Sequence, residues 1–169
     1  MTTRDAQGEL QFRVSVPFAI FEHPPIPAGG LPMANSASAV FERMQGYQKA
    51  AAEFMHTIYL DPKNHILDIR HFQGTTDSAA VYPAEVMRGA LLTPGCTGMI
   101  FVHNHPTGDT DPSLCDREIT RELIFAAKTL GFRVLDHVII GNSSLFYSFA
   151  DHGLIEDYSL LFLNAKRQP

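Results

Sequence analysis

The chain has too few cysteines for a disulfide-built protein. Only two of its 169 residues are cysteine, Cys96 and Cys115, and two isolated thiols in a chain of this length do not make a disulfide framework. Their scarcity fits a reducing compartment, and residues 1–10 lack the apolar core of a signal peptide, so we expect a cytoplasmic protein. Both cysteines are expected to be small, half-buried side chains.

Basic clusters and long apolar runs are also lacking. The 13 Lys and Arg residues are outnumbered by 18 Asp and Glu residues, which gives a net charge of −5. Domains that bind duplex DNA usually present a basic face, so this balance argues against nucleic acid as the main partner. No segment reaches the ~18 consecutive apolar residues of a membrane-spanning helix, so no membrane span is expected.

What the chain does contain is the material for one folded domain. Its residues are 45% hydrophobic and 18% charged, as in soluble globular proteins that bury a core. Residues 1–34 predict a short strand over 10–16 and then a Pro- and Gly-rich segment at 23–32. Residues 35–155 form the predicted domain, and the apolar tail 156–169 is expected to dock as a last helix. The apolar terminal segments would also suit a homodimer.

Helical and strand periodicities alternate within the predicted domain. Helical spacing and capping residues predict helices over 37–54, 81–92 and 113–131. Short β-rich runs predict strands over 54–61, 65–72, 99–102, 132–141 and 145–150. Because the first two and the last two strands are close in sequence, both pairs are expected to be hairpins. The pattern therefore predicts a mixed α/β (α+β) sheet flanked by helices, not a doubly wound parallel sheet.

Two histidines, His103 and His105, follow a predicted buried strand in the sequence HNHP. Residues two apart in a strand face the same side, so both imidazoles should point to one place just past the strand end. Imidazole suits zinc and other borderline metals, and Asp116, at the start of the next helix, is the natural third ligand. Such a site leaves zinc one position for water, whose pKa it lowers toward neutrality.

The same residues also have simpler interpretations. Ser113 and Asp116 have the spacing of a helix capping box, in which the aspartate accepts a hydrogen bond from the backbone N–H of the serine. A lone H-x-H pair is more often two unrelated histidines than a metal site. The combination of strand end, histidine pair, turn and capped helix favours a metal site. Cys115, in the first turn of this helix, is a further candidate nucleophile because that position can lower a thiol pKa.

A hydrolase that activates water also needs a general base, and two glutamates are candidates. Glu85 follows Pro83 in the first turn of a predicted helix, where the helix dipole favours a carboxylate whatever its function. Glu53 lies at a predicted helix–strand junction, where an acid at a helix C-terminus opposes the dipole. A residue that breaks a local preference is the better functional candidate, so Glu53 is the first choice and Glu85 the second.

Several motifs occur in a fixed order over roughly residues 35–155. His103 to Asp116 follow the pattern H-x-H-P, six further residues, then S-x-x-D. The accompanying segments are EFMHTIYLD at 53–61, GTTDSAAVYPAEVMRGALL at 74–92 and LDHVIIG at 135–141. Together they resemble RadC-like JAB-domain proteins of the JAMM/MPN metalloprotease superfamily. The resemblance implies a curved mixed β-sheet between helices, similar in layout to cytidine deaminase.

The resemblance also implies a chemistry for these residues. It implies one zinc ion per chain on His103, His105 and Asp116, and Ser113 as the group that stabilises an oxyanion. It implies a glutamate as general base on the attacking water, and Glu53 matches that glutamate best. The implied activity is hydrolysis of amide bonds in a peptide or isopeptide substrate. His137, within LDHVIIG, is expected to serve the strand or to support a ligand without binding metal.

Two other functions stay open at this point. The RadC name suggests a DNA repair-associated binding protein, but the acidic balance and the lack of a helix-hairpin-helix pattern ahead of the domain speak against it. A non-catalytic scaffold domain is the other alternative, and the complete set of candidate ligands disfavours it. The sequence leaves the substrate open, because fold and ligands define a reaction type far better than a partner.

Overall fold

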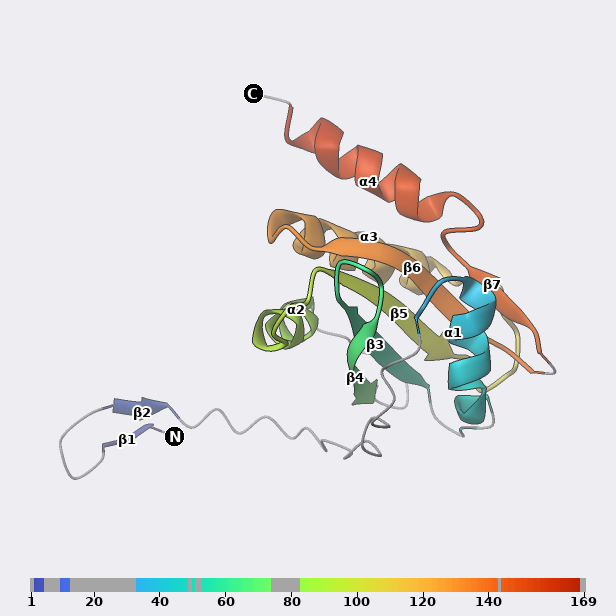
Figure 1. The fold of residues 1–169 in the computed structure, drawn as a ribbon, viewed down its shortest axis with the longest axis horizontal. Helices are drawn as coiled ribbons and strands as arrows, with labels where there is room; N and C mark the ends of the chain where they lie inside the picture. Colours follow the sequence, from blue (N-terminus) through green and yellow to red (C-terminus); the bar gives the residue numbers. More distant parts are fainter. Residues whose placement is uncertain are drawn as a thin grey trace.

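A five-stranded mixed sheet forms the centre of the computed structural model, which describes residues 2–4, 10–12, 33–48, 50, 53–73, 83–142 and 144–167. The strand order is β4-β3-β5-β6-β7 (Figure 1). The strands are β3 (Phe54–Leu60), β4 (Ile66–Gln73), β5 (Gly98–Asn104), β6 (Arg133–Ile140) and β7 (Phe146–Ser148). Strands β5 and β6 run parallel, and the other neighbouring pairs are antiparallel. The predicted mixed α/β class is confirmed, with both expected hairpins.

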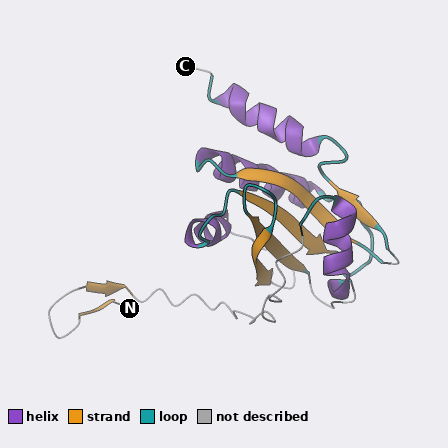
Figure 2. Ribbon diagram, viewed as in Figure 1, coloured by secondary structure: helices purple, strands orange, loops and turns teal. Residues whose placement is uncertain are grey.

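Helices cover both faces of this sheet (Figure 2). They are α1 (Ala37–Met44), α2 (Pro83–Leu92), α3 (Leu114–Thr129) and α4 (Leu154–Ala165), with a short 3-10 helix, η1 (Gln45–Tyr47), directly after α1. The buried residues of α1 pack with Ile58 on one face of β3. Those of α2 and α3 pack with Tyr59 on the other face. Successive residues of β3 thus feed two separate cores, which is why its apolar run is nearly continuous.

The central strand β5 is longer than the sequence predicts. It was expected over 99–102 but runs from Gly98 to Asn104, and every residue in it is buried. The last residues of β5 pair with neighbouring strands on both sides, since His103 pairs with Met55 of β3 and with Ile139 of β6. Pairing with two neighbours extends a strand beyond its apolar core. His103 therefore lies inside the strand, and His105 is the first residue beyond it.

The helix predicted over 37–54 is too long. The α-helix ends at Met44 and η1 ends at Tyr47, with Gly46 in the transition; glycine is among the weakest helix formers. Glu53 then lies directly before β3, outside any helix. The argument that an acid at a helix C-terminus marks Glu53 as functional is therefore wrong, and its role depends on its position in three dimensions.

Helix α4 occupies most of the C-terminal tail and packs on α3. The rings of Phe162 and Phe125 meet edge to face with their centroids 5.4 Å apart, and Ile155 joins the core beside Ile124. Leu160, Leu161 and Leu163 stay about half exposed on α4. The homodimer expected from the apolar terminal segments stays a prediction.

The N-terminal segment contributes a small antiparallel pair, β1 (Thr2–Arg4) and β2 (Leu10–Phe12). The strand expected over 10–16 is thus described only at its start. The Pro- and Gly-rich segment at 23–32 and residues 74–82 of the GTTDSAAVYP motif lie outside the described residues. In the part of the chain that the structure describes, no helix combines the length and the apolar character needed to cross a membrane.

Candidate metal centre

Four polar side chains from separate elements converge at the end of β5. Glu53 comes from the residue directly before β3, His103 from β5, His105 from the loop that follows β5 and Asp116 from the first turn of α3. Each offers one ligand atom, and these atoms all lie within 4.8 Å of one another. The structure therefore brings together the three predicted ligands and the first-choice base.

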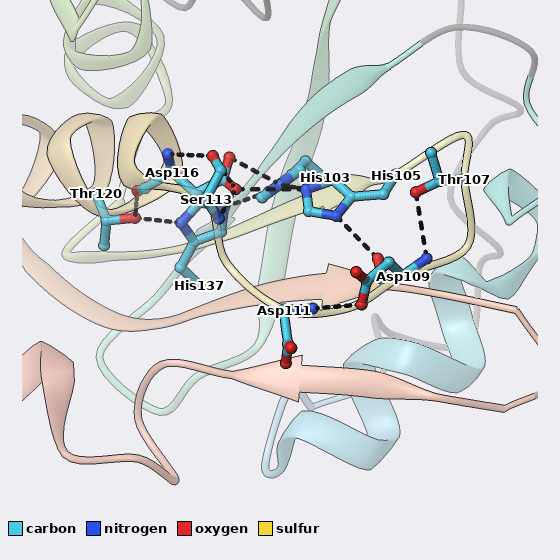
Figure 3. Close-up of polar contacts among 9 residues, drawn as sticks. All are labelled: His103, His105, Thr107, Asp109, Asp111, Ser113, Asp116, Thr120 and His137. Atoms are coloured by element: carbon cyan, nitrogen blue, oxygen red, sulfur yellow. Dashed lines mark hydrogen bonds and ion pairs between the residues drawn. The ribbon is translucent and has the colours of Figure 1, made fainter.

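The three predicted ligands form a compact triangle (Figure 3). The Nε2 atoms of His103 and His105 are 2.9 Å apart. The Asp116 carboxylate oxygens lie 3.2 Å from Nε2 of His103 and 3.4 Å from Nε2 of His105. Ligand atoms about 2.0–2.2 Å from a tetrahedral zinc ion lie roughly 3.3 Å apart, so the donor set and its spacing fit zinc.

The capping box at the start of α3 is present and orients the Asp116 carboxylate. The Ser113 backbone N–H and hydroxyl both donate to Oδ2 of Asp116, at 2.7 and 2.6 Å, and the Asp116 N–H donates back to the hydroxyl at 3.1 Å. This leaves Oδ1 of Asp116 as the oxygen nearest His103. Capping and ligation are therefore compatible, because Oδ1 takes no part in these capping bonds and lies beside His103, while Oδ2, which accepts them, also lies 3.4 Å from Nε2 of His105.

A backbone carbonyl sets the orientation of the His105 ring. Its Nδ1 lies 2.8 Å from the carbonyl oxygen of Asp109. A carbonyl only accepts, so Nδ1 must carry the hydrogen, and the neutral ring then has a bare Nε2. That lone pair faces His103 and Asp116.

The loop that carries Asp109 is anchored to the connection between β6 and β7. The Gly108 N–H donates to the His105 carbonyl at 2.9 Å, and the Asn142 N–H donates to the Gly108 carbonyl at 3.2 Å. Gly108 has φ +79°, a left-handed conformation that a residue with a side chain adopts at a cost. The tight loop thus holds the Asp109 carbonyl where it meets the His105 ring.

The charges of the three predicted ligands favour a cation at the centre of the triangle. Burial alone would raise the pKa of Asp116, but hydrogen bonds with His103 and His105 outweigh it and hold this pKa well below its usual value. In turn, the hydrogen bond to Asp116 raises the pKa of His105, against the effect of burial. An ionised carboxylate held between two imidazoles at a buried point is a suitable place for a cation.

The pairing of β3 with β5 positions Glu53. The backbone N–H of Phe54 donates to Oδ1 of Asn104 at 3.0 Å, and Asn104 is fully buried. The half-buried Glu53 carboxylate contributes to the raised pKa of His105. Glu85, the second-choice base, instead forms an ion pair with Arg88 on α2 and is not part of the cluster.

Two residues behind the ligands complete the site, and the sequence singled out only one of them. His137 is fully buried, with Nε2 2.8 Å from Nδ1 of His103. Thr120 is also fully buried, with Oγ1 2.6 Å from Nδ1 of His137. Thr120 was not anticipated. The signal for it was its position one helical turn after Asp116, which puts both residues on the same face of α3.

The cysteines lie outside the candidate site. Cys96 is half-buried as expected, but Cys115 is exposed, so the expectation that both are half-buried is wrong for Cys115. Its neighbour Asp116 points inward, and adjacent residues of a helix face different directions. Cys115 does not belong to the cluster that could hold a metal.

Comparison with known proteins identifies the family. The RadC-like JAB domain matches residues 34–154. The chain is 41% identical over 112 residues to a UPF0758 protein of Vibrio cholerae serotype O1, an alignment that covers 66% of this chain and 67% of the relative. It is 40% identical over 126 residues to UPF0758 protein PSHAa2643 of Pseudoalteromonas translucida, covering 72% and 54%. The chain belongs to the RadC-like JAB family.

A third relative is UPF0758 protein YfjY of Escherichia coli K12, 40% identical over 116 residues that cover 67% of this chain and 68% of the relative. The chain therefore spans between about half and two thirds of the length of these curated relatives. Their names state no activity, so the chemistry must be argued from the site.

Proposed function

We propose that this protein is a zinc-dependent hydrolase of amide bonds, a metallopeptidase or isopeptidase with one zinc ion per chain on His103, His105 and Asp116. The observation that carries the proposal is that Glu53 shares one cluster with these three residues, within 4.8 Å. Two imidazoles and one carboxylate form a three-ligand set that leaves zinc an open position. When bound, zinc supplies a Lewis acid that polarises a carbonyl and lowers the pKa of water.

Glu53 is the proposed general base. Its half-buried carboxylate takes a proton from the attacking water as the water oxygen bonds to the carbonyl carbon of the substrate. When the carbon–nitrogen bond breaks, Glu53 returns that proton to the departing amine. A general base must lie beside the predicted ligands. The cluster contains two carboxylates, and Glu53 is the one that is not a predicted ligand.

Ser113 is the proposed oxyanion donor. Its side chain is exposed at the start of α3 and can meet a substrate. The hydroxyl has one hydrogen, which it donates to Asp116. When the Asp116 carboxylate engages a cation, this acceptor weakens, and the hydroxyl can turn its hydrogen toward a developing oxyanion.

The first test is metal content. Elemental analysis of untagged protein, purified without added metal, is compared with that of the His103→Ala/His105→Ala variant. About one zinc per chain in the parent, lost in the variant, is the expected result for a single three-ligand site. If neither protein holds metal even after zinc is supplied, the hydrolase proposal fails and the scaffold alternative takes its place.

The second test separates the base from the ligands. Glu53→Gln is expected to keep its zinc and to lose about 10²–10⁴-fold in turnover, the usual contribution of a general base. Glu85→Gln is the matched control and is expected to keep both. The assay uses blocked fluorogenic peptides and lysine-linked isopeptide conjugates. If Glu53→Gln hydrolyses substrate at the parent rate, Glu53 is not the base.

A further inference from the structure

We propose that Thr120 and His137 are positioning residues that hold the hydrogen of the His103 ring on Nδ1, so that its Nε2 lone pair faces the metal centre. The inference rests on the proposed zinc site for its purpose. Its physical content is a set of hydrogen-bond directions within the metal-free chain, and these directions follow from counting donors and acceptors.

The first step is the direction of the Thr120 hydroxyl. Its Oγ1 lies 2.5 Å from the backbone carbonyl oxygen of Asp116. Two oxygens this close repel unless a hydrogen lies between them, and a carbonyl cannot supply one. The single hydroxyl hydrogen of Thr120 is therefore donated to Asp116. Towards any other neighbour, the Thr120 oxygen can only accept.

The second step is the tautomer of His137. Its Nδ1 lies 2.6 Å from the Thr120 oxygen, so Nδ1 must carry a hydrogen. The ring stacks on Phe149 with centroids 4.9 Å apart and meets the edge of Phe101 at 6.0 Å. The ring is fully buried between these aromatic rings, and such an apolar environment favours the neutral imidazole. A neutral ring with its hydrogen on Nδ1 has a bare, accepting Nε2.

The third step is the tautomer of His103, which follows from the accepting Nε2 of His137. Its Nδ1 lies 2.8 Å from the accepting Nε2 of His137, so His103 is the donor and its hydrogen stays on Nδ1. The opposite nitrogen, Nε2, is then bare. It is the atom that lies 2.9 Å from His105 and 3.2 Å from Asp116.

The consequence is that both histidines turn lone pairs to one point. The Asp109 carbonyl imposes the same tautomer on His105, and an oxygen of Asp116 completes the set. Three electron-rich atoms at this spacing repel one another unless a proton or a cation lies between them, so a metal ion can take the place of a proton that they would otherwise share. With the other tautomer, His103 would point an N–H into the centre and could not act as a ligand through Nε2.

Asp116 links both ends of this arrangement. Its carboxylate belongs to the ligand triangle, while its backbone carbonyl starts the series of hydrogen bonds through Thr120 and His137 to His103. The first turns of α3 therefore set both the third ligand and the proton position of the first. His137, which the sequence analysis placed in support of a ligand, has a specific part in this arrangement.

The test is a set of three full-length variants. Thr120→Val keeps the shape of the side chain but removes the hydroxyl, and Thr120→Ser keeps the hydroxyl. Thr93→Val is the matched control, because Thr93 is also buried and its hydroxyl also donates to a carbonyl four residues earlier, that of Gly89, at 2.8 Å. The hydrogen bonds of Thr93 in the described part of the chain join it to Gly89, Ala90 and Cys96, and none of these is a candidate ligand.

Two quantities are measured for each variant. Zinc affinity is obtained by competition with a chelator. The tautomer of His103 is read from long-range nitrogen–proton correlation spectra of the metal-free protein on the alkaline side of neutrality, where imidazoles are uncharged. Thr120→Val is expected to weaken zinc binding about 10–100-fold, as is usual for loss of a residue that orients a ligand, and to move the His103 hydrogen toward Nε2. Thr120→Ser and Thr93→Val are expected to match the parent in both.

The inference is overturned if Thr120→Val keeps the zinc affinity of the parent and His103 keeps its hydrogen on Nδ1. Because the spectra are recorded on metal-free protein, they test the hydrogen-bond arrangement independently of the proposed hydrolase function. If the parent binds no zinc but Thr120→Val still moves the His103 hydrogen toward Nε2, the hydrolase proposal is refuted and the arrangement is supported. If Thr120→Val does not fold, His137→Gln and His137→Leu replace it. Gln still offers His103 an accepting oxygen, so equal zinc affinities in these two variants would overturn the inference.

Discussion

Gly141→Ala should separate metal binding from general stability. Gly141 is buried at the end of β6, where a Cβ atom would lie 2.3 Å from Cγ2 of Thr110 and 2.6 Å from the carbonyl oxygen of Gly108. Van der Waals contacts become ordinary only at 3.4 Å. The Thr110 methyl can rotate away, but the Gly108 oxygen belongs to the backbone. The loop after His105 must therefore move as a whole.

The expected size of the effect follows from these contacts. Forcing a methyl group into a packed site usually costs about 1–3 kcal/mol of folding free energy. The displaced loop also stretches the Asn142 to Gly108 hydrogen bond, whose net contribution is about 0.5–1.5 kcal/mol and is part of that cost. The same loop carries the Asp109 carbonyl that orients His105. Loss of such an orienting partner weakens metal binding about 10–100-fold.

The control is Gly131→Ala. Gly131 has φ +84°, and a Cβ there would meet nothing within 4 Å. The left-handed conformation alone costs about 1–2 kcal/mol, so both variants should lose similar stability in urea unfolding of the metal-free proteins. Only Gly141→Ala should lose zinc affinity in chelator competition. The reasoning is refuted if Gly141→Ala binds zinc like the parent, or if Gly131→Ala weakens zinc binding as much.

Three further predictions concern the core, the pH dependence and the exposed thiol. Leu123 is fully buried between α3 and the sheet, so Leu123→Ala should cost about 2–5 kcal/mol in urea unfolding, and a cost below about 1 kcal/mol would contradict this packing. Burial places the folded pKa of His137 below its unfolded value, so its contribution to metal-free stability is complete above about pH 6.5 and is lost as the pH falls. The urea midpoint of the parent should therefore drop from neutral to mildly acidic pH more steeply than that of His137→Gln, and equal slopes would count against a neutral buried ring. The pKa of Asp116 is also lowered, but its contribution is lost only below about pH 4. Alkylation of the exposed Cys115 should leave zinc content and turnover intact, whereas loss of turnover with zinc retained would support a thiol nucleophile.

Short-range patterns were enough for much of the fold. The hairpins of β3 with β4 and of β6 with β7 join strands that are neighbours in sequence, so periodicity and turn residues predict them. The capping box of Ser113 and Asp116 spans one helical turn, and its geometry is local. The spacing of His103 and His105 likewise follows from the extended backbone around them. In each case the interacting groups are a few residues apart, and the backbone itself sets their geometry.

Only the tertiary structure decided the rest. Glu53 reaches the site because β3 pairs with β5, fifty residues further along the chain, and the local argument that favoured it failed. Thr120 acquires its role because α3 packs against β6, where His137 lies between it and His103. Such contacts depend on how the buried faces of distant elements pack together. The sequence by itself determined which residues could bind a metal. The packing of β3, β5, β6 and α3 decided which carboxylate and which buried polar groups lie beside them, because those groups meet only when the sheet is assembled.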